Sequence, residues 1–127
     1  MRGILFRGMT EDKRWIEGSL ADQNGYYIST LPRLGKKNRG VYTFDDFEKV
    51  LPETVGQYIG QTDTNKTKIF EGDIVENSDD LYTVEWSEDR VRFVLSGDGV
   101  EADFDNFWGY ELEVIGNIYE NKELLEG

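Results

Sequence analysis

Glu53–Gly60 reads ETVGQYIG, Lys68–Val75 reads KIFEGDIV, and these two segments decide the fold of the chain. Both are rich in β-branched and aromatic residues, which suit a pleated surface. In the second segment Gly72 supplies a positive φ or a close backbone approach, and Asp73 can hydrogen-bond the backbone as the chain turns. The two segments therefore predict a strand, a polar loop and a second strand, with a structural corner at Gly72 and Asp73.

The chain after Val75 alternates apolar and polar residues, with turn signals such as Ser87–Arg90 and Ser96–Gly99 between the runs. Short strands separated by turns about every ten residues are typical of an antiparallel sheet curled into a small barrel. We therefore expect a mainly β fold with a small antiparallel barrel-like meander over about residues 53–119. The alternating apolar positions are Tyr82, Val84, Trp86, Val91, Phe93, Leu95, Val100, Ala102, Phe104, Leu112, Val114 and Ile118.

The N-terminal part predicts a β-hairpin with one further strand before it. Side chains alternate over Trp15–Ala21, and Tyr26–Leu31 is again rich in strand-forming residues. Between them, Asn24-Gly25 tolerates positive φ at both positions, as a tight hairpin turn requires. We expect one domain, in which an N-terminal hairpin subdomain covers about residues 1–50 and the barrel-like subdomain covers about 53–125.

Two short helical turns complete the predicted fold, at about residues 45–51 and 121–126. Four apolar residues at i, i+3, i+6 and i+7, counted from Phe44, share one face of the first helix, and Pro52 ends it. Asn121 can cap the second helical turn.

The composition excludes several chemistries. The 127 residues include no Cys and no His, which excludes disulfides, thiolate or imidazole metal sites, and nucleophiles activated by histidine. No apolar run approaches the ~18 residues of a membrane span, and the N-terminus becomes polar too early for a signal peptide. We therefore expect a cytoplasmic protein that has no cofactor and no metal and does not contact a membrane.

Charge is distributed unevenly along the chain. Residues 1–50 hold nine Lys/Arg and seven Asp/Glu, whereas residues 51–127 hold five and nineteen, and the whole chain has a formal net charge of −12. Such a field disfavours a phosphate backbone near the C-terminal part. The acidic surface either keeps the protein soluble or meets a basic partner.

One basic loop runs against this trend. It spans residues 32–40 and is the best candidate for contact with a polyanion, although a solvated loop has the same composition. Its basic residues are Arg33, Lys36, Lys37 and Arg39.

An aromatic segment suggests self-association. Phe104, Phe107, Trp108 and Tyr110 crowd a short stretch, which is more aromatic surface than one small barrel readily buries. We predict that Phe107, Trp108 and Tyr110 support a homo-oligomer. The alternative is that these side chains fill the second half of the core.

The chain resembles the YopX family of small phage and prophage proteins. The resemblance is close over about residues 53–125 and loose before them. Two departures affect local turns: Asn65-Lys66 stands where relatives usually have Asn-Gly, and Lys122 stands where relatives often have Pro. The resemblance implies a mostly β fold of small barrel-like units and brings no established activity or catalytic residues. It is carried by Glu53–Tyr58, Gly60, Asp63, Lys68–Val75, Val84–Trp86, Leu112–Asn121 and Glu123–Leu125.

Three functions remain open at this level. The carboxylates fall largely in predicted turns, where Asp and Asn serve the backbone, so we do not expect an enzyme. The first function is a phage or prophage accessory module that binds a host or phage protein. The second is nucleic-acid binding through the basic loop, with aromatic residues such as Trp15 or Tyr26 stacking on bases. The third is an acidic decoy that imitates DNA.

Overall fold

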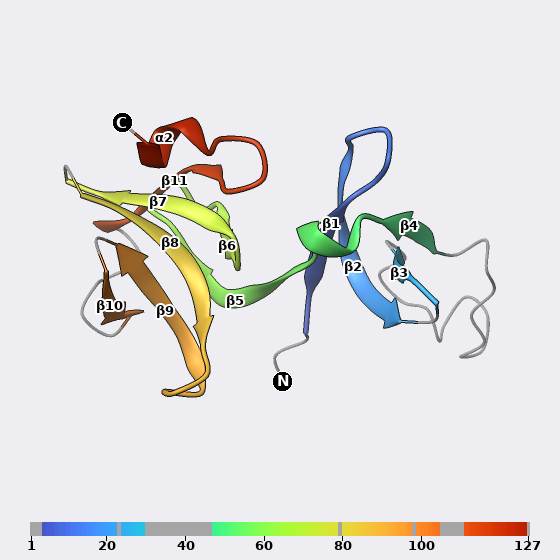
Figure 1. Cartoon of the computed structure of the whole chain (residues 1–127), viewed down its shortest axis with the longest axis horizontal. Coiled ribbons are helices and arrows are strands. Elements are labelled where there is room, and N and C mark those ends of the chain that lie inside the picture. Colours follow the sequence, from blue (N-terminus) through green and yellow to red (C-terminus); the bar gives the residue numbers. More distant parts are fainter. Residues whose placement is uncertain are drawn as a thin grey trace. The chain divides into compact units, whose positions relative to one another are not determined.

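The structure is a computed structural model that describes residues 4–22, 24–29, 47–78, 80–97, 99–104 and 111–126. It divides into two compact units, Met1–Gln57 and Tyr58–Gly127 (Figure 1). The division falls a few residues after the subdomain boundary expected at about 50–53. Each unit has its own buried apolar cluster.

The N-terminal unit is an antiparallel sheet with strand order β4-β3-β2-β1-β5. Its core cluster is Ile16, Ile28 and Val50, so the alternation of strand β2 and its partners buries one face. The predicted hairpin over residues 15–29 is present, with Asn24 and Gly25 both at positive φ. The elements are β1 Phe6–Met9, β2 Trp15–Asp22, β3 Tyr26–Ser29, β4 Glu48–Val50, the 3-10 turn η2 Pro52–Thr54 and β5 Gly56–Thr62.

The structure describes residues 47–51 of the helix predicted over 45–51, and there the prediction is wrong. Glu48–Val50 forms strand β4, which pairs antiparallel with β3, and Pro52 begins the 3-10 turn η2 instead of ending a helix. Val50 is buried against Ile16 and Ile28. The edge of β3 offers backbone partners that an isolated helical turn lacks, so tertiary pairing overrides the apolar spacing.

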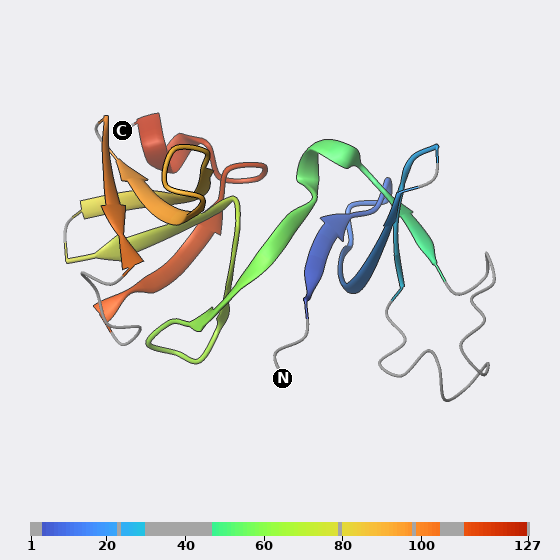
Figure 2. The same ribbon diagram turned by 90° about the horizontal axis from the view of Figure 1, so that it is seen from below.

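The C-terminal unit contains an antiparallel meander with strand order β10-β9-β8-β7-β11 (Figures 1 and 2). Strand β5 enters this unit after Gln57 and pairs with β6 through Tyr58 and Thr62. The mainly β fold is confirmed, but over the described residues the strands form open sheets, with no pairing between β10 and β11 to close a barrel. The elements are β6 Lys68–Phe70, β7 Asp73–Asn77, β8 Asp80–Ser87, β9 Arg92–Gly97, β10 Val100–Asp103, β11 Glu113–Asn117 and α2 Glu123–Glu126.

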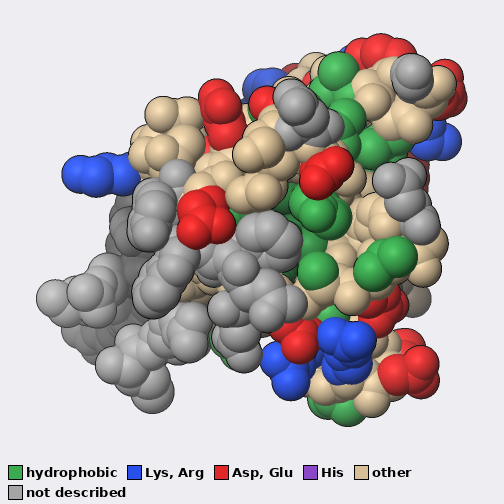
Figure 3. Space-filling model, turned by 90° about the vertical axis from the view of Figure 1, so that its left-hand side faces the viewer, with side chains coloured by type: hydrophobic (Ala, Val, Ile, Leu, Met, Phe, Trp, Pro, Cys, Tyr) green, Lys and Arg blue, Asp and Glu red, His purple; other side chains and the backbone are tan. Residues whose placement is uncertain are grey.

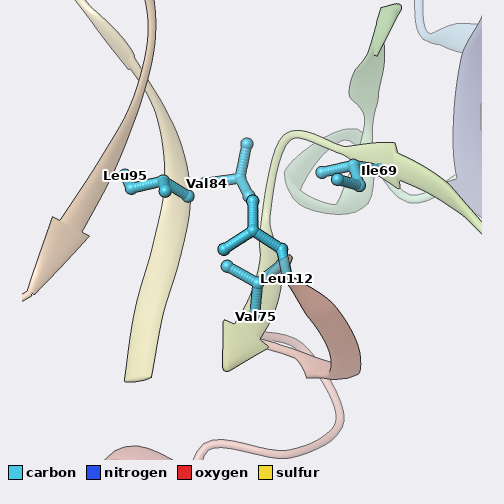
Figure 4. Packing of buried hydrophobic residues seen from close by; sticks show 5 residues of the cluster. All are labelled: Ile69, Val75, Val84, Leu95 and Leu112. Atoms are coloured by element: carbon cyan, nitrogen blue, oxygen red, sulfur yellow. The ribbon is translucent and has the colours of Figure 1, made fainter. Parts of the chain in front are cut away.

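One face of this meander carries the core of the C-terminal unit. Figure 4 shows five buried aliphatic side chains that point toward one another from β6, β7, β8, β9 and the residue before β11. Tyr82, Ala102 and Phe104 pack at the margin of this cluster. Because paired residues of neighbouring strands share a face, the register places Val75, Val84, Leu95 and Ala102 on one side of the meander, and Ile69 joins the cluster from β6. The five are Ile69, Val75, Val84, Leu95 and Leu112.

The helical turn predicted at 121–126 is confirmed as helix α2, which covers four residues. It follows a turn in which Asn121 Oδ1 accepts a hydrogen bond from Asn117 N at 3.1 Å. In the described part of the chain, no helix has both the length and the apolar character needed to cross a membrane.

Candidate functional site

The sequence-predicted site residues fall in two groups. The proposed polyanion contacts Arg33, Lys36, Lys37 and Arg39 lie outside the described residues, as do the proposed self-association residues Phe107, Trp108 and Tyr110. Gly72 and Asp73 are described and lie between β6 and the start of β7.

The Gly72–Asp73 corner is a structural element. Gly72 has φ +95°, its N donates to Val84 O at 2.8 Å, and its O accepts from Ile118 N at 2.9 Å. A Cβ at Gly72 would lie 2.8 Å from Tyr119 Cε2. Asp73 is 1% exposed, and its Oδ2 accepts from Phe70 N at 2.8 Å. Both residues serve the fold, because these hydrogen bonds join the corner to β6, β8 and the segment after β11.

The turn Asp63–Thr67 is fixed from inside in the same way. Asp63 is 5% exposed, and its Oδ1 accepts from Asn65 N and Thr67 N, each at 2.8 Å. Its Oδ2 accepts from Val114 N at 2.8 Å, which ties the turn to β11. Lys66 has φ +66°. One carboxylate thus satisfies three backbone donors, and the turn is a structural element.

A different surface lies at the end of the β8–β9 hairpin, over Trp86–Phe93, which we call the hairpin tip. Trp86 and Phe93 are direct cross-strand partners. Their ring centroids are 5.1 Å apart at an interplanar angle of 76°, the edge-to-face arrangement that aromatic pairs favour. Trp86 is nevertheless 41% exposed. The pair continues the apolar core face out to the surface.

The turn that closes the hairpin tip presents a valine to solvent. Ser87 is buried, its O accepts from Val91 N at 2.8 Å, and its Oγ accepts from Arg90 N at 3.2 Å. Val91 has φ +54° and is 71% exposed. Among the described residues, Lys13, Asn24, Lys66 and Ser78 are the other non-glycine residues at positive φ, and all are polar. Within the described ranges, Val91 alone combines this conformation with a β-branched side chain.

Ion pairs hold the arginines of the tip. Arg90 Nη1 lies 2.7 Å from Asp103 Oδ1, and Arg90 Nε lies 3.8 Å from Glu101 Oε1. Arg92 Nη1 lies 3.7 Å from the same Asp103 oxygen. The exposed carboxylates Glu85, Glu88 and Asp89 have no such partner within the described ranges. Two arginines are thus matched by two acidic residues of β10, and three carboxylates remain.

Figure 3 shows one face of the molecule as a space-filling surface. Acidic side chains are scattered over it among apolar patches, and basic, acidic and apolar side chains gather at its lower end. Figure 3 is turned about the vertical axis of Figure 1, so its lower end corresponds to the lower end of Figure 1, where the β8–β9 turn lies. This end of the molecule therefore presents apolar side chains together with basic and acidic ones.

The N-terminal unit has an exposed charged turn of its own. Arg14 contacts Asp12 and Glu48, and the Thr10 hydroxyl donates to Asp12. The hydrogen bond from Thr10, and then that from Arg14, lower the pKa of Asp12 below its ordinary value. The two carboxylates raise the pKa of Arg14. Paired in this way, the groups stabilise a surface turn and offer no site.

Stacking of bases on Trp15 has less room than the sequence suggests. The Arg7 guanidinium lies over the Trp15 ring, with its Cζ 4.7 Å from the ring centroid. Tyr26 packs against the core cluster of the N-terminal unit. Both aromatic rings are partly buried.

No metal site is found among the residues that the structure describes, where no three acidic side chains are grouped to hold an ion.

The alternation of the sequence does not reveal the hairpin tip. Trp86 continues the alternation of Tyr82 and Val84, which predicts a core position, and Val91 was expected to begin the next strand. The structure begins β9 at Arg92 and leaves Val91 in the turn. One signal of an unusual turn was present in the sequence: the turn has neither Gly nor Asn at position 91, which adopts positive φ.

Comparison with known proteins gives the family. No curated protein matches the chain. The family described as YopX protein matches residues 5–126, including the N-terminal part in which the resemblance by motif is loose. Because this match covers nearly the whole chain, the protein belongs to the YopX family.

Proposed function

We propose that this protein is a non-enzymatic interaction module of a phage or prophage, which binds a host or phage protein in the cytoplasm of the host cell. The observation that carries the proposal is the exposed Trp86, packed on the half-buried Phe93 and followed in the next turn by the exposed Val91, on a unit that is otherwise strongly acidic. Tryptophan is enriched at the energetic centres of protein interfaces. A solvent-facing Trp on the core side of a sheet is therefore a natural anchor.

The alternative use of these residues is to stabilise the fold, and the geometry limits how much they do so. The exposed part of the Trp86 side chain stays in contact with water, so this apolar area contributes nothing to the stability of the fold. The edge-to-face arrangement of Trp86 and Phe93 adds about 0.5–1.5 kcal/mol to what their buried area contributes. The exposed area is best explained by a partner that covers it.

Affinity capture with a matched variant tests the proposal. Tagged wild type and Trp86→Ser are compared in nuclease-treated bacterial lysate, with Val100→Ser as the control. Val100 is also apolar and is 63% exposed, but it pairs with Gly97 at the opposite end of β9. We expect a protein retained by wild type and Val100→Ser and lost by Trp86→Ser. Equal retention by all three, or no retained protein, would overturn the proposal.

A second function, an acidic decoy of DNA, is supported by charge. Residues 58–127 hold eighteen Asp/Glu and five Lys/Arg, a formal net charge of −13, whereas residues 1–57 hold eight and nine. Such a unit attracts DNA-binding proteins through their basic surfaces. A captured partner that is displaced by duplex DNA, and does not respond to Trp86→Ser, would favour the decoy over the apolar module.

Nucleic-acid binding through Arg33, Lys36, Lys37 and Arg39 is the remaining alternative, and the net charge of −12 opposes it. A gel shift with duplex and single-stranded DNA at low salt tests it. Shifted DNA that is released by substitution of these four residues would support this alternative.

Self-association is a separate proposal that rests on Phe107, Trp108 and Tyr110. Light scattering at micromolar concentration should give a mass above that of one chain, and Trp108→Glu should return the protein to a monomer. A monomer mass for the wild type would rule it out.

A further inference from the structure

We infer that the hairpin tip is a preformed prong whose Val91 side chain enters an apolar pocket, rimmed by Lys or Arg, on a partner protein. This inference rests on the proposed interaction function and specifies the chemistry of the partner. It is carried by the backbone conformation of Val91, the contacts that fix the turn, and the charges around it.

The conformation of Val91 is the first argument. Its φ of +54° lies in the left-handed region, where Gly fits freely and Asn is tolerated. A β-branched side chain there is strained, and strained backbone persists where the surroundings fix it, often at binding sites. At 71% exposure the side chain contributes almost nothing to the core of its own chain. The fold alone thus favours another residue at position 91.

The second argument is that the turn is held in place without a partner. Ser87 O and Oγ accept from Val91 N and Arg90 N, respectively, and the Arg90 side chain is paired to Asp103 on β10. The Ser87 hydroxyl also donates to Glu101 Oε1 at 3.3 Å. These contacts order the turn before binding, which reduces the entropy lost on association.

The charges around Val91 indicate the chemistry of the partner surface. Glu85, Glu88 and Asp89 are exposed, whereas Arg90 and Arg92 are matched by Asp103 and Glu101. The free charge near Val91 is therefore negative, and it adds to the net charge of −13 over residues 58–127. The hairpin tip of a second copy carries the same negative charge and would be repelled. A pocket with a basic rim is complementary to the tip.

Photo-crosslinking from position 91 tests the inference in the full-length chain. A benzophenone amino acid replaces Val91 in one variant and Lys66 in a control variant, and both are irradiated in nuclease-treated bacterial lysate. Lys66 is a suitable control because it is exposed and has φ +66° in another turn of the same unit. Thermal melting verifies that both variants fold. We expect a protein adduct from position 91 that is absent from position 66.

The protein found in the adduct is then purified, and its binding to further variants tests how it recognises the tip. Val91→Gly should weaken binding roughly tenfold, the loss of one well-placed anchor, while Val91→Ile should retain it. The double variant Glu88→Lys, Asp89→Lys should also weaken binding, and added salt should weaken the wild type more than this variant.

The outcomes separate the two proposals. No adduct, an adduct with a second copy, or binding unaffected by Val91→Gly or by charge reversal would overturn the prong. If capture still depends on Trp86 in any of those cases, the interaction module stands and only its partner chemistry is wrong. If capture does not depend on Trp86 either, both proposals fall.

Discussion

Two kinds of turn in the C-terminal unit contrast with each other. The inner turns, Asp63–Thr67 and Phe70–Asp73, are fixed by buried carboxylates that accept hydrogen bonds from backbone N–H groups. The hairpin tip, Trp86–Phe93, is fixed by a serine and by exposed ion pairs, and it presents Trp86 and Val91 to solvent. The residues of the inner turns are explained by the fold, whereas the exposed apolar residues of the tip are not.

This contrast shows where to look for function in the unit. Gly72 occupies a positive-φ position at which a side chain has no room, whereas Val91 occupies one at which the residue is 71% exposed. Glycine is the residue that a positive-φ position favours. The valine thus marks the position where a requirement outside the fold is the better explanation.

The largest predicted effect is at the inner corner. Gly72→Val should destabilise the fold by roughly 2–5 kcal/mol, because backbone strain at a φ of +95° adds to overpacking against Tyr119. Denaturant titration of the two proteins measures the change in unfolding free energy. Gly99→Val is the control: Gly99 also has positive φ, but nothing lies within 4 Å of its Cβ position, so only the strain remains. Equal losses in the two variants would contradict the role of Tyr119.

The next effect is at the inner carboxylate. Asp63→Asn preserves the shape of the side chain but replaces one acceptor oxygen with an NH₂ group. The amide cannot accept from Val114 N while its oxygen serves Asn65 N and Thr67 N. We expect a loss of about 2 kcal/mol, the cost of leaving a buried backbone donor unpaired. An unfolding midpoint equal to that of wild type would show that Asp63 does not fix this turn.

Much of the fold follows from the sequence, for physical reasons that differ by region. The alternation over Trp15–Ala21, with Asn24-Gly25 after it, predicts a hairpin because a two-residue period and a turn signal specify the same structure. Residues 47–51 mislead because Val50 fits a helix by spacing but gains more as a strand paired with β3. Local pattern cannot reveal a pairing partner that is distant in the chain.

The candidate site was less predictable than the fold. Trp86 has the same alternation as Val84, yet Val84 is buried and Trp86 is not. The difference depends on how far the core extends along β8, which only the packed structure fixes. The turn position of Val91 could not be predicted either, since a strand beginning at 91 and a turn ending there have the same sequence pattern.

A smaller effect of opposite sign is predicted at the two exposed positive-φ positions. Lys66→Gly and Val91→Gly should each stabilise the fold by about 0.5–1 kcal/mol, because removing the strain outweighs the extra chain entropy of Gly in the unfolded state. The gain should be larger for Val91, whose side chain is β-branched. Thermal melting of both variants measures this. Destabilisation by Val91→Gly would mean that the valine contributes to the fold and would remove the basis of the contrast.

The smallest effect is expected from the ion pairs of the tip. Asp103→Asn makes the same chemical change as Asp63→Asn but at a half-buried group whose arginine partners are exposed, Arg90 at 2.7 Å and Arg92 at 3.7 Å. Exposed ion pairs contribute little to stability, so we expect a loss of at most about 0.5 kcal/mol, which salt should reduce further.

The same variant should nevertheless loosen the tip locally. In this variant the Arg90 side chain loses the negative charge of its closest partner, while the bonds from Val91 N to Ser87 O and from Arg90 N to Ser87 Oγ remain. Amide hydrogen exchange at Val91 should accelerate, because this amide exchanges through local opening of the turn. Exchange at Thr67, whose amide is bound by Asp63, should be unchanged. Acceleration at both amides would mean that Asp103 supports the whole unit, and the tip could then not be treated as a separately ordered prong.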